Sequence, residues 1–182
     1  MLRSIVLMGL RGSGKSTLGP MLAAKLGFDF QDLDQAVLSD SSYETIADIV
    51  REEGWEGFRS REREQLQLWL WALDTLPQRR LVLALGGGVP THEPSHALLQ
   101  SAQLHGFVAS VYLRAKPETL AKRMASSADR PSLTGKDPIA EIRDIFNQRD
   151  ELYRSIADAV VDIDTLDQNA TVNAIELALQ NL

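Results

Sequence analysis

Residues 9–16 read Gly9-Leu10-Arg11-Gly12-Ser13-Gly14-Lys15-Ser16, which matches the pattern G-x-x-x-x-G-K-[ST] at every fixed position. Glycines let the backbone curl so that successive N–H groups converge on phosphate oxygens. We expect Lys15 to reach the β- and γ-phosphates of a nucleotide and the Ser16 hydroxyl to bind Mg²⁺. The apolar run at 4–8 predicts a buried strand directly before this segment, and leucines at helical spacing in 15–26 predict a helix directly after it. The sequence therefore predicts a phosphate-binding loop that leads into a helix N-terminus.

The rest of the chain alternates short apolar runs with amphipathic stretches. Strands are predicted at 4–8, 28–33, 81–85, 107–113 and 159–163, and helices at 15–26, 43–51, 55–73, 94–102, 117–125, 137–154 and 169–181. Apolar strands that alternate with helices indicate an α/β fold with a mostly parallel sheet covered on both faces. Ligands bind such sheets at the carboxyl ends of the strands, so the loops after Met8, Leu33 and Leu85 are the expected places for chemistry.

Length and composition narrow the class of protein. The 182 residues suit a single domain spanning 1–182, and the formal net charge of −6 argues against a nucleic-acid-binding protein. An anionic substrate would then need locally clustered arginines. The absence of cysteine excludes disulfides and thiolate chemistry. No apolar run approaches the roughly 20 residues of a membrane helix, and no secretory signal precedes the first strand, so we expect a cytoplasmic protein without membrane association.

Two large groups of phosphate-loop proteins do not fit. The chain contains no Asn-Lys-x-Asp segment, which a guanine-specific GTPase would use to recognise its base. The strand at 81–85 ends in Gly86-Gly87-Gly88, where an ABC-type or helicase-type ATPase would carry an acidic residue. The small-metabolite kinases are the class that remains.

Further segments, in chain order, resemble the shikimate kinase family. These are Asp32-Leu33-Asp34, Phe58-Arg59-Ser60-Arg61-Glu62, Gly86-Gly87-Gly88, Arg130-Pro131, and Arg149 followed by Leu152-Tyr153 and Ala157-Asp158. The resemblance extends from Gly9 to about Asp158. It implies a single P-loop kinase domain with a five-stranded parallel sheet in the order 2-3-1-4-5. It also implies ATP-dependent phosphorylation of the 3-hydroxyl of shikimate, with Mg²⁺, in aromatic amino acid biosynthesis, by a monomer.

The resemblance also implies a role for individual residues. ATP would be bound by Gly12, Ser13, Gly14, Lys15, Ser16, Thr17, Arg123 and Arg130. Shikimate would be bound by Asp34, Arg59, Glu62, Gly86, Gly87, Gly88 and Arg149, with Arg59 and Arg149 on its carboxylate. Mg²⁺ would be held by Ser16 and, through water, by Asp32. The catalytic residues would be Lys15, Asp34 and Arg130, the last on a mobile lid at about 126–137.

Simpler interpretations exist for several of these residues. Asp32 and Asp34 could be a turn and a helix cap. Arg59 lies in a run of alternating charge that is typical of a solvated helix face. Arg123 could be an isolated surface arginine. The chain also has no proline after Pro138, whereas members of the family often place one against adenine.

Three other functions stay open at the level of sequence. A gluconate kinase would carry a His-Pro pattern after the second strand, where this chain has Asp34-Gln35. An adenylate or nucleoside kinase would add an element that recognises the base. A non-catalytic ATP-binding relative would have lost its acceptor site, yet Asp34, Arg59 and Arg149 are all present.

Overall fold

The structure is a computed structural model that describes residues 4–76, 78–124 and 138–182. Within them the chain forms a five-stranded parallel sheet in the order β2-β3-β1-β4-β5, which confirms the predicted order. The strands are β1 (Ser4–Met8), β2 (Asp29–Asp32), β3 (Leu81–Ala84), β4 (Val108–Arg114) and β5 (Ala159–Asp162).

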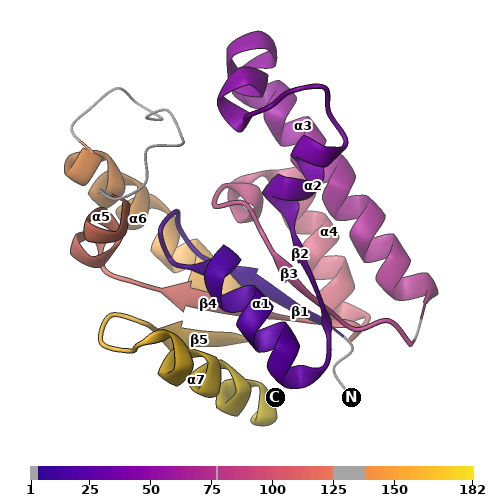
Figure 1. The fold of residues 1–182 in the computed structure, drawn as a ribbon, viewed down its shortest axis with the longest axis vertical. Helices are drawn as coiled ribbons and strands as arrows, with labels where there is room; N and C mark the ends of the chain where they lie inside the picture. Colours follow the sequence, from indigo (N-terminus) through magenta and orange to yellow (C-terminus); the bar gives the residue numbers. More distant parts are fainter. Residues whose placement is uncertain (1–3, 77, 125–137) are drawn as a thin grey trace.

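Helices cover both faces of this sheet (Figure 1). α1 and α7 lie together on one face, and α4 and α6 contact β4 from the other. The helices are α1 (Lys15–Leu26), α2 (Leu33–Ser39), α3 (Ile46–Thr75), α4 (Glu93–Leu104), α5 (Pro117–Met124), α6 (Pro138–Ile156) and α7 (Gln168–Gln180), with a 3₁₀ turn η1 (Val89–Thr91). No helix in the described part of the chain is long and apolar enough to cross a membrane.

Each predicted strand and helix is present, and two elements were not predicted. The two helices expected at 43–51 and 55–73 are the two parts of α3, which is interrupted at Gly54 (φ 73°, ψ 177°). Only glycine adopts this conformation readily, so Gly54 marks the break. α2 and η1 were missed. The strand-like residues 28–33 run directly into α2, and seven residues are too few to show a helical period.

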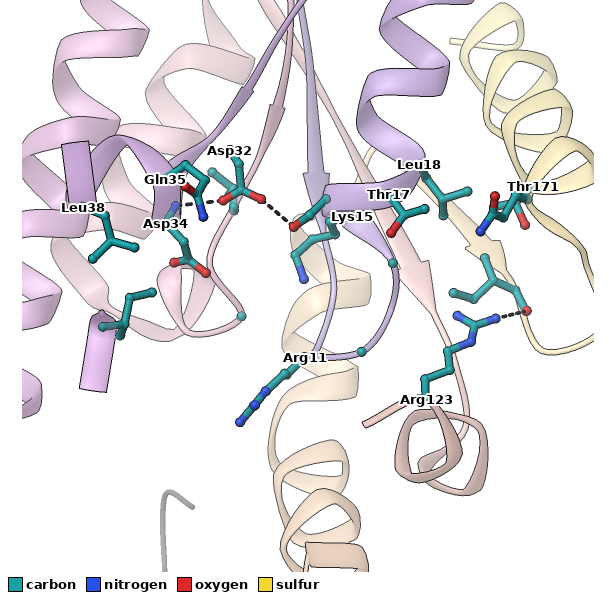
Figure 2. Close-up of a pocket in the computed structure, with 18 of the residues that line it drawn as sticks. Arg11, Lys15, Thr17, Leu18, Asp32, Asp34, Gln35, Leu38, Arg123 and Thr171 are labelled. Carbon is teal, nitrogen blue, oxygen red and sulfur yellow. Dashed lines mark hydrogen bonds between the residues drawn. The ribbon is translucent and has the colours of Figure 1, made fainter. Parts of the chain in front are cut away.

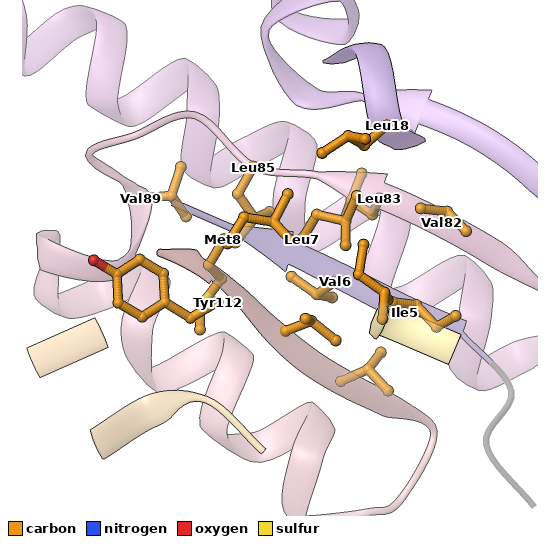
Figure 3. Packing of buried hydrophobic residues seen from close by; sticks show 14 of the residues in the cluster. Ile5, Val6, Leu7, Met8, Leu18, Val82, Leu83, Leu85, Val89 and Tyr112 are labelled. Carbon is orange, nitrogen blue, oxygen red and sulfur yellow. The ribbon is translucent and has the colours of Figure 1, made fainter. Parts of the chain in front are cut away.

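The main hydrophobic core is built around β1, the central strand. Val6, Leu7 and Met8 are completely buried because the strand is covered on both sides (Figure 3). Side chains from β3, β4 and α1 pack against it, so the phosphate-loop segment that follows Met8 starts from the centre of the main core.

A second, smaller cluster of buried side chains lies between α2 and α3. It consists of Val37, Ile46, Ile49 and Phe58, and we call it the small core. Arg59 directly follows Phe58 on α3, so the small core fixes the helix surface that carries this arginine.

Candidate active site

The phosphate loop joins β1 to α1 at the carboxyl edge of the sheet. Gly12 (φ 82°) and Gly14 (φ 89°) both lie in the left-handed region, which explains the need for glycine at these two positions. The Lys15 Nζ donates hydrogen bonds to the carbonyl oxygens of Gly9 (2.8 Å) and Leu10 (3.2 Å). The ammonium group therefore lies against the loop itself, where a nucleotide phosphate would be bound.

Ser16 and Asp32 meet beside this loop. The Ser16 hydroxyl donates to Asp32 Oδ2 at 2.5 Å, and Asp32 Oδ1 accepts from the backbone N–H of Asp34 at 2.9 Å (Figure 2). Asp32 is thus the N-cap of α2, as the simpler interpretation proposed, and its second oxygen still reaches the loop serine. Asp34 lies in the first turn of α2, and it faces the same cavity as Lys15.

A cavity of about 1020 Å³ runs along the phosphate loop. Asp34 and Gln35 line one end, Lys15 lies in the middle, and Arg123 and Thr171 line the other end (Figure 2). This volume is at the upper end of the range for small-molecule sites, so the cavity is large enough for a nucleotide.

The Arg123 end of the cavity combines a flat cation with apolar side chains. The Arg123 guanidinium donates to the carbonyl oxygen of Ile163 at 3.4 Å, and Ile163 and Leu166 line the cavity beside it. Asp164 joins this loop to α5, since it accepts from the Thr119 hydroxyl (2.6 Å) and the Lys116 N–H (2.9 Å). Arg123 is therefore not an isolated surface residue, and this end suits a planar base that stacks on a guanidinium.

The triple glycine is packed against charged side chains. A Cβ on Gly86 would collide with the Glu62 carboxylate and would lie 3.0 Å from Asp34 Oδ1. A Cβ on Gly88 would collide with the Arg59 guanidinium. A side chain at Gly86 or Gly88 would therefore displace Glu62 or Arg59, and the loop brings together side chains from α2 and α3 that are far apart in the sequence.

Arg59 forms an ion pair with Glu62, whose side chain is only 1% exposed. The Arg59 guanidinium also lies 5.7 Å from the ring centroid of Trp55 and 5.4 Å from that of Phe58, within the range of cation–π contacts. The Arg59 side chain is 20% exposed. Arg59 is consequently not part of a solvated helix face, and the interpretation based on alternating charge is wrong at this position.

Arg149 approaches the same loop from α6. Its Nη1 donates to the carbonyl oxygen of Gly87 at 2.8 Å. Arg59 at Gly88 and Arg149 at Gly87 therefore bracket the triple glycine with two guanidinium groups. Arg59, Arg149 and Glu62 do not line the cavity, but Gly87 does, so these three charged side chains lie next to the cavity at the triple glycine.

Asp150 holds α6 against the end of β4. Its carboxylate accepts from the Tyr112 hydroxyl (2.9 Å), from Arg114 Nε (2.9 Å) and Nη2 (3.1 Å), and from Arg154 Nε (3.2 Å). Burial favours the neutral acid, but the hydrogen bonds from Arg114 and Tyr112 outweigh it and hold the pKa of Asp150 below its usual value. Sequence reasoning missed this group, although a tyrosine within a buried strand must find a partner for its hydroxyl.

We expect Asp150→Asn to lower the free energy of unfolding at pH 7 by about 1–3 kcal/mol, because the guanidinium of Arg114 loses the less exposed of its two carboxylate partners and keeps only Asp162. A carboxyl group whose pKa is lowered by folding stabilises the fold at pH values above its pKa in the unfolded state. This stabilisation is lost as the pH falls through its pKa in the folded state. The difference in the free energy of unfolding between the variant and the parent protein should therefore shrink below about pH 4. Urea unfolding at pH 7 and pH 3.5 measures it, with the exposed Asp74→Asn as control. A difference that is the same at both pH values would contradict the prediction.

Arg130 and the expected lid at 126–137 lie outside the described residues. Both stay predictions from the sequence.

The comparison with known families agrees with this arrangement. A sequence model described as shikimate kinase matches residues 11–180 of the chain. The chain belongs to the shikimate kinase family.

Individual shikimate kinases are similar over nearly their whole length. Shikimate kinase 2 of Yersinia pestis (strain Pestoides F) is 39% identical over 165 residues, which cover 89% of this chain and 87% of that relative. The structure of shikimate kinase from Acinetobacter baumannii in complex with shikimate has a TM-score of 0.85 and 31% identity, over 100% of this chain and 95% of that one. Shikimate kinase from Bacteroides thetaiotaomicron has a TM-score of 0.80 and 26% identity, over 97% and 98%.

Proposed function

We propose that this chain transfers the γ-phosphate of ATP to the 3-hydroxyl of shikimate, giving shikimate 3-phosphate and ADP for aromatic amino acid biosynthesis. The observation that carries the proposal is the pair of guanidinium groups, Arg59 and Arg149, that brackets the triple glycine beside Asp34. The membership of this chain in the shikimate kinase family and the presence of a phosphate loop in the same site support the proposal. The two arginines suit an acceptor with a carboxylate at one end, and Asp34 suits hydroxyl groups at the other end.

ATP would occupy the cavity along the phosphate loop. The N–H groups of residues 12–17 would surround the phosphates, and the base would lie against Arg123, Ile163 and Leu166. Leu166 lines the cavity from the loop after β5, a loop in which other family members often carry a proline, and we propose that Leu166 makes an apolar contact to adenine.

Shikimate would lie across the triple glycine. Its carboxylate would be bound by Arg59 and Arg149, because the planar guanidinium group matches a carboxylate in two parallel hydrogen bonds. Glu62 already pairs with Arg59, and it would hold that guanidinium in place when the substrate arrives. The absence of side chains at Gly86 and Gly88 leaves backbone groups available to the ring hydroxyls.

In the transfer step the 3-hydroxyl oxygen forms a bond to the γ-phosphorus while the bond from that phosphorus to the bridging oxygen of ADP breaks. Asp34 would orient the hydroxyl and accept its proton. Lys15 would neutralise charge on the transferred group, since phosphoryl transfer depends mainly on positioning and charge stabilisation. For Arg130 the family resemblance alone supports a role in the same charge stabilisation.

Mg²⁺ fits the oxygen atoms that meet beside the loop. Ser16 Oγ and Asp32 Oδ2 are 2.5 Å apart, and both are hard oxygen donors. Across the described residues, no group of three or more His, Asp or Glu side chains could form a complete metal cage. Such a sparse set suits Mg²⁺, which usually takes one or two protein ligands and completes its shell with water and phosphate. We propose that Ser16 binds the ion directly and Asp32 through water; when bound, it would offset phosphate charge.

The experiment that tests the function is ADP release from Mg-ATP in a coupled assay, with shikimate, gluconate or AMP as acceptor. Saturable stimulation by shikimate alone is the expected result. Stimulation by gluconate or AMP would instead favour one of the other kinase classes. Bound ATP with no stimulation by any acceptor would favour a non-catalytic relative.

We also propose that the enzyme works as a monomer in the cytoplasm, on the strength of the family resemblance. Light scattering at assay concentration would test the assembly state, and a mass of twice 20.1 kDa would refute a monomer.

A further inference from the structure

Tyr153 is a buried residue that no part of the proposed reaction uses. It lies on α6 one turn after Arg149 and is completely buried. Its hydroxyl donates to the carbonyl oxygen of Gly87, which also accepts from Arg149 Nη1 at 2.8 Å. A carbonyl oxygen has two lone pairs, so Tyr153 and Arg149 together use both.

The surroundings of Tyr153 keep its ring and hydroxyl in one place. Its ring meets that of Tyr112 edge to face, with centroids 5.3 Å apart, and the Tyr112 hydroxyl is bonded to Asp150 at 2.9 Å. Asp150 is in turn bonded to Arg114 at the end of β4. Burial raises the pKa of the Tyr153 hydroxyl to about 12, so the group is a neutral donor throughout the usual assay range. A rigid donor therefore faces the middle glycine of the acceptor loop.

We propose that Tyr153 is a positioning residue that fixes the Gly87 carbonyl and, through it, the direction in which Arg149 presents its guanidinium to the carboxylate of the acceptor. This inference rests on the proposed function of Arg149. Without the Tyr153 hydroxyl, the Gly87 carbonyl keeps only its hydrogen bond from Arg149. The position of this carbonyl, and with it that of the Arg149 guanidinium, is then less restricted. The grip on the acceptor should loosen, while the phosphate loop, whose Lys15 is bonded to Gly9 and Leu10 rather than to Tyr153, should change much less.

Tyr153→Phe removes the hydroxyl and keeps the ring. We expect the KM for shikimate to rise about tenfold, as the loss of one buried hydrogen bond would give, with kcat and the KM for ATP changing by less than about twofold. The matched control is Tyr112→Phe. It removes a hydroxyl from the neighbouring ring but keeps the edge-to-face contact of that ring with Tyr153, so it should change the KM for shikimate by less than about twofold. Thermal unfolding of both variants reports their stability.

A second measurement separates positioning from stability. In an Arg149→Ala background the additional change Tyr153→Phe should alter the KM for shikimate by less than about twofold, because the hydroxyl acts through that arginine. Full additivity of the two changes would overturn the proposal. So would an unchanged KM in the single variant, equal effects in the Tyr112→Phe control, or failure of Tyr153→Phe to fold, since the hydroxyl would then serve stability.

Failure of this inference is distinguishable from failure of the proposed function. Shikimate phosphorylation by the unchanged protein tests the function, and it is measured first. Only the variants test Tyr153.

Discussion

Lys15→Met is expected to lower kcat by about 10²- to 10³-fold, the loss typical when one charge-stabilising donor is removed from a transition state. Methionine keeps the length of the lysine stem and removes its ammonium group. That group lies within 2.8–3.2 Å of the Gly9 and Leu10 carbonyls, so it is already held at the loop where the transferred phosphate would be. All three donors of the ammonium group are used by Gly9, Leu10 and Ser13, so at least one of these bonds is exchanged for a phosphate oxygen when the nucleotide binds. Single-turnover ADP formation at saturating ATP and shikimate measures the effect on the chemical step.

Lys25→Met is the matched control for this change. Lys25 lies near the end of the same helix, is partly exposed, and pairs with Glu176 and Asn173 of α7. Its loss should leave kcat within about twofold, since a surface ion pair contributes roughly 0–1 kcal/mol to stability. A Lys15→Met enzyme with nearly the parent kcat would remove Lys15 from the catalytic residues.

Arg59→Ala is expected to reduce kcat/KM for shikimate by about 30- to 5,000-fold, which corresponds to roughly 2–5 kcal/mol for a desolvated carboxylate that loses its partner. The KM for ATP should change much less, because Arg59 lies at Gly88 on the acceptor side and does not line the nucleotide cavity. Steady-state kinetics with each substrate varied in turn would measure both values.

Glu62 complicates this variant, and a second one resolves the difficulty. Removing Arg59 leaves the Glu62 carboxylate buried beside Gly86 without its ion-pair partner, which could distort the loop. In Arg59→Ala/Glu62→Gln the stranded charge is removed. If the loss of kcat/KM persists there and exceeds the loss in Glu62→Gln alone, it reflects the missing contact between Arg59 and shikimate. Recovery to the parent value would show that Arg59 acts only by neutralising Glu62. Arg51→Ala, an exposed change on the same helix, is the control.

The strands β1, β3 and β4 could be predicted because each is a short apolar run with a clear end, whereas the order of the sheet followed only from the family resemblance. The segment 4–16 is the best case, since a buried strand, a glycine loop and a helix follow one another with no ambiguity. α2 was not predictable because its first residues serve two elements: Asp32 ends β2 and also caps the helix. The break at Gly54 could be expected from glycine alone, but not the left-handed φ that produces it.

The motif residues of the site were predictable, and their supports were not. Asp34, Arg59 and Arg149 come from segments that the family resemblance identifies. Tyr153 is bonded to a backbone carbonyl 66 residues away, and Asp150 is bonded to the hydroxyl of Tyr112, which is 38 residues away. Neither hydrophobic period nor spacing carries such information. The burial of Glu62 could not be predicted either, because it lies in a segment of alternating charges, which is typical of an exposed helix face.

The separation of the small core from the main core has a consequence for how acceptor preference could change over evolutionary time. The nucleotide side is anchored in the main core around β1. The turns of α3 next to Arg59 are supported by the small core, and only the later turns of α3 join the main core. The residues of the small core could therefore be substituted during evolution without disrupting the phosphate loop. A descendant lineage could thus exchange one acceptor for another while its ATP chemistry stayed intact.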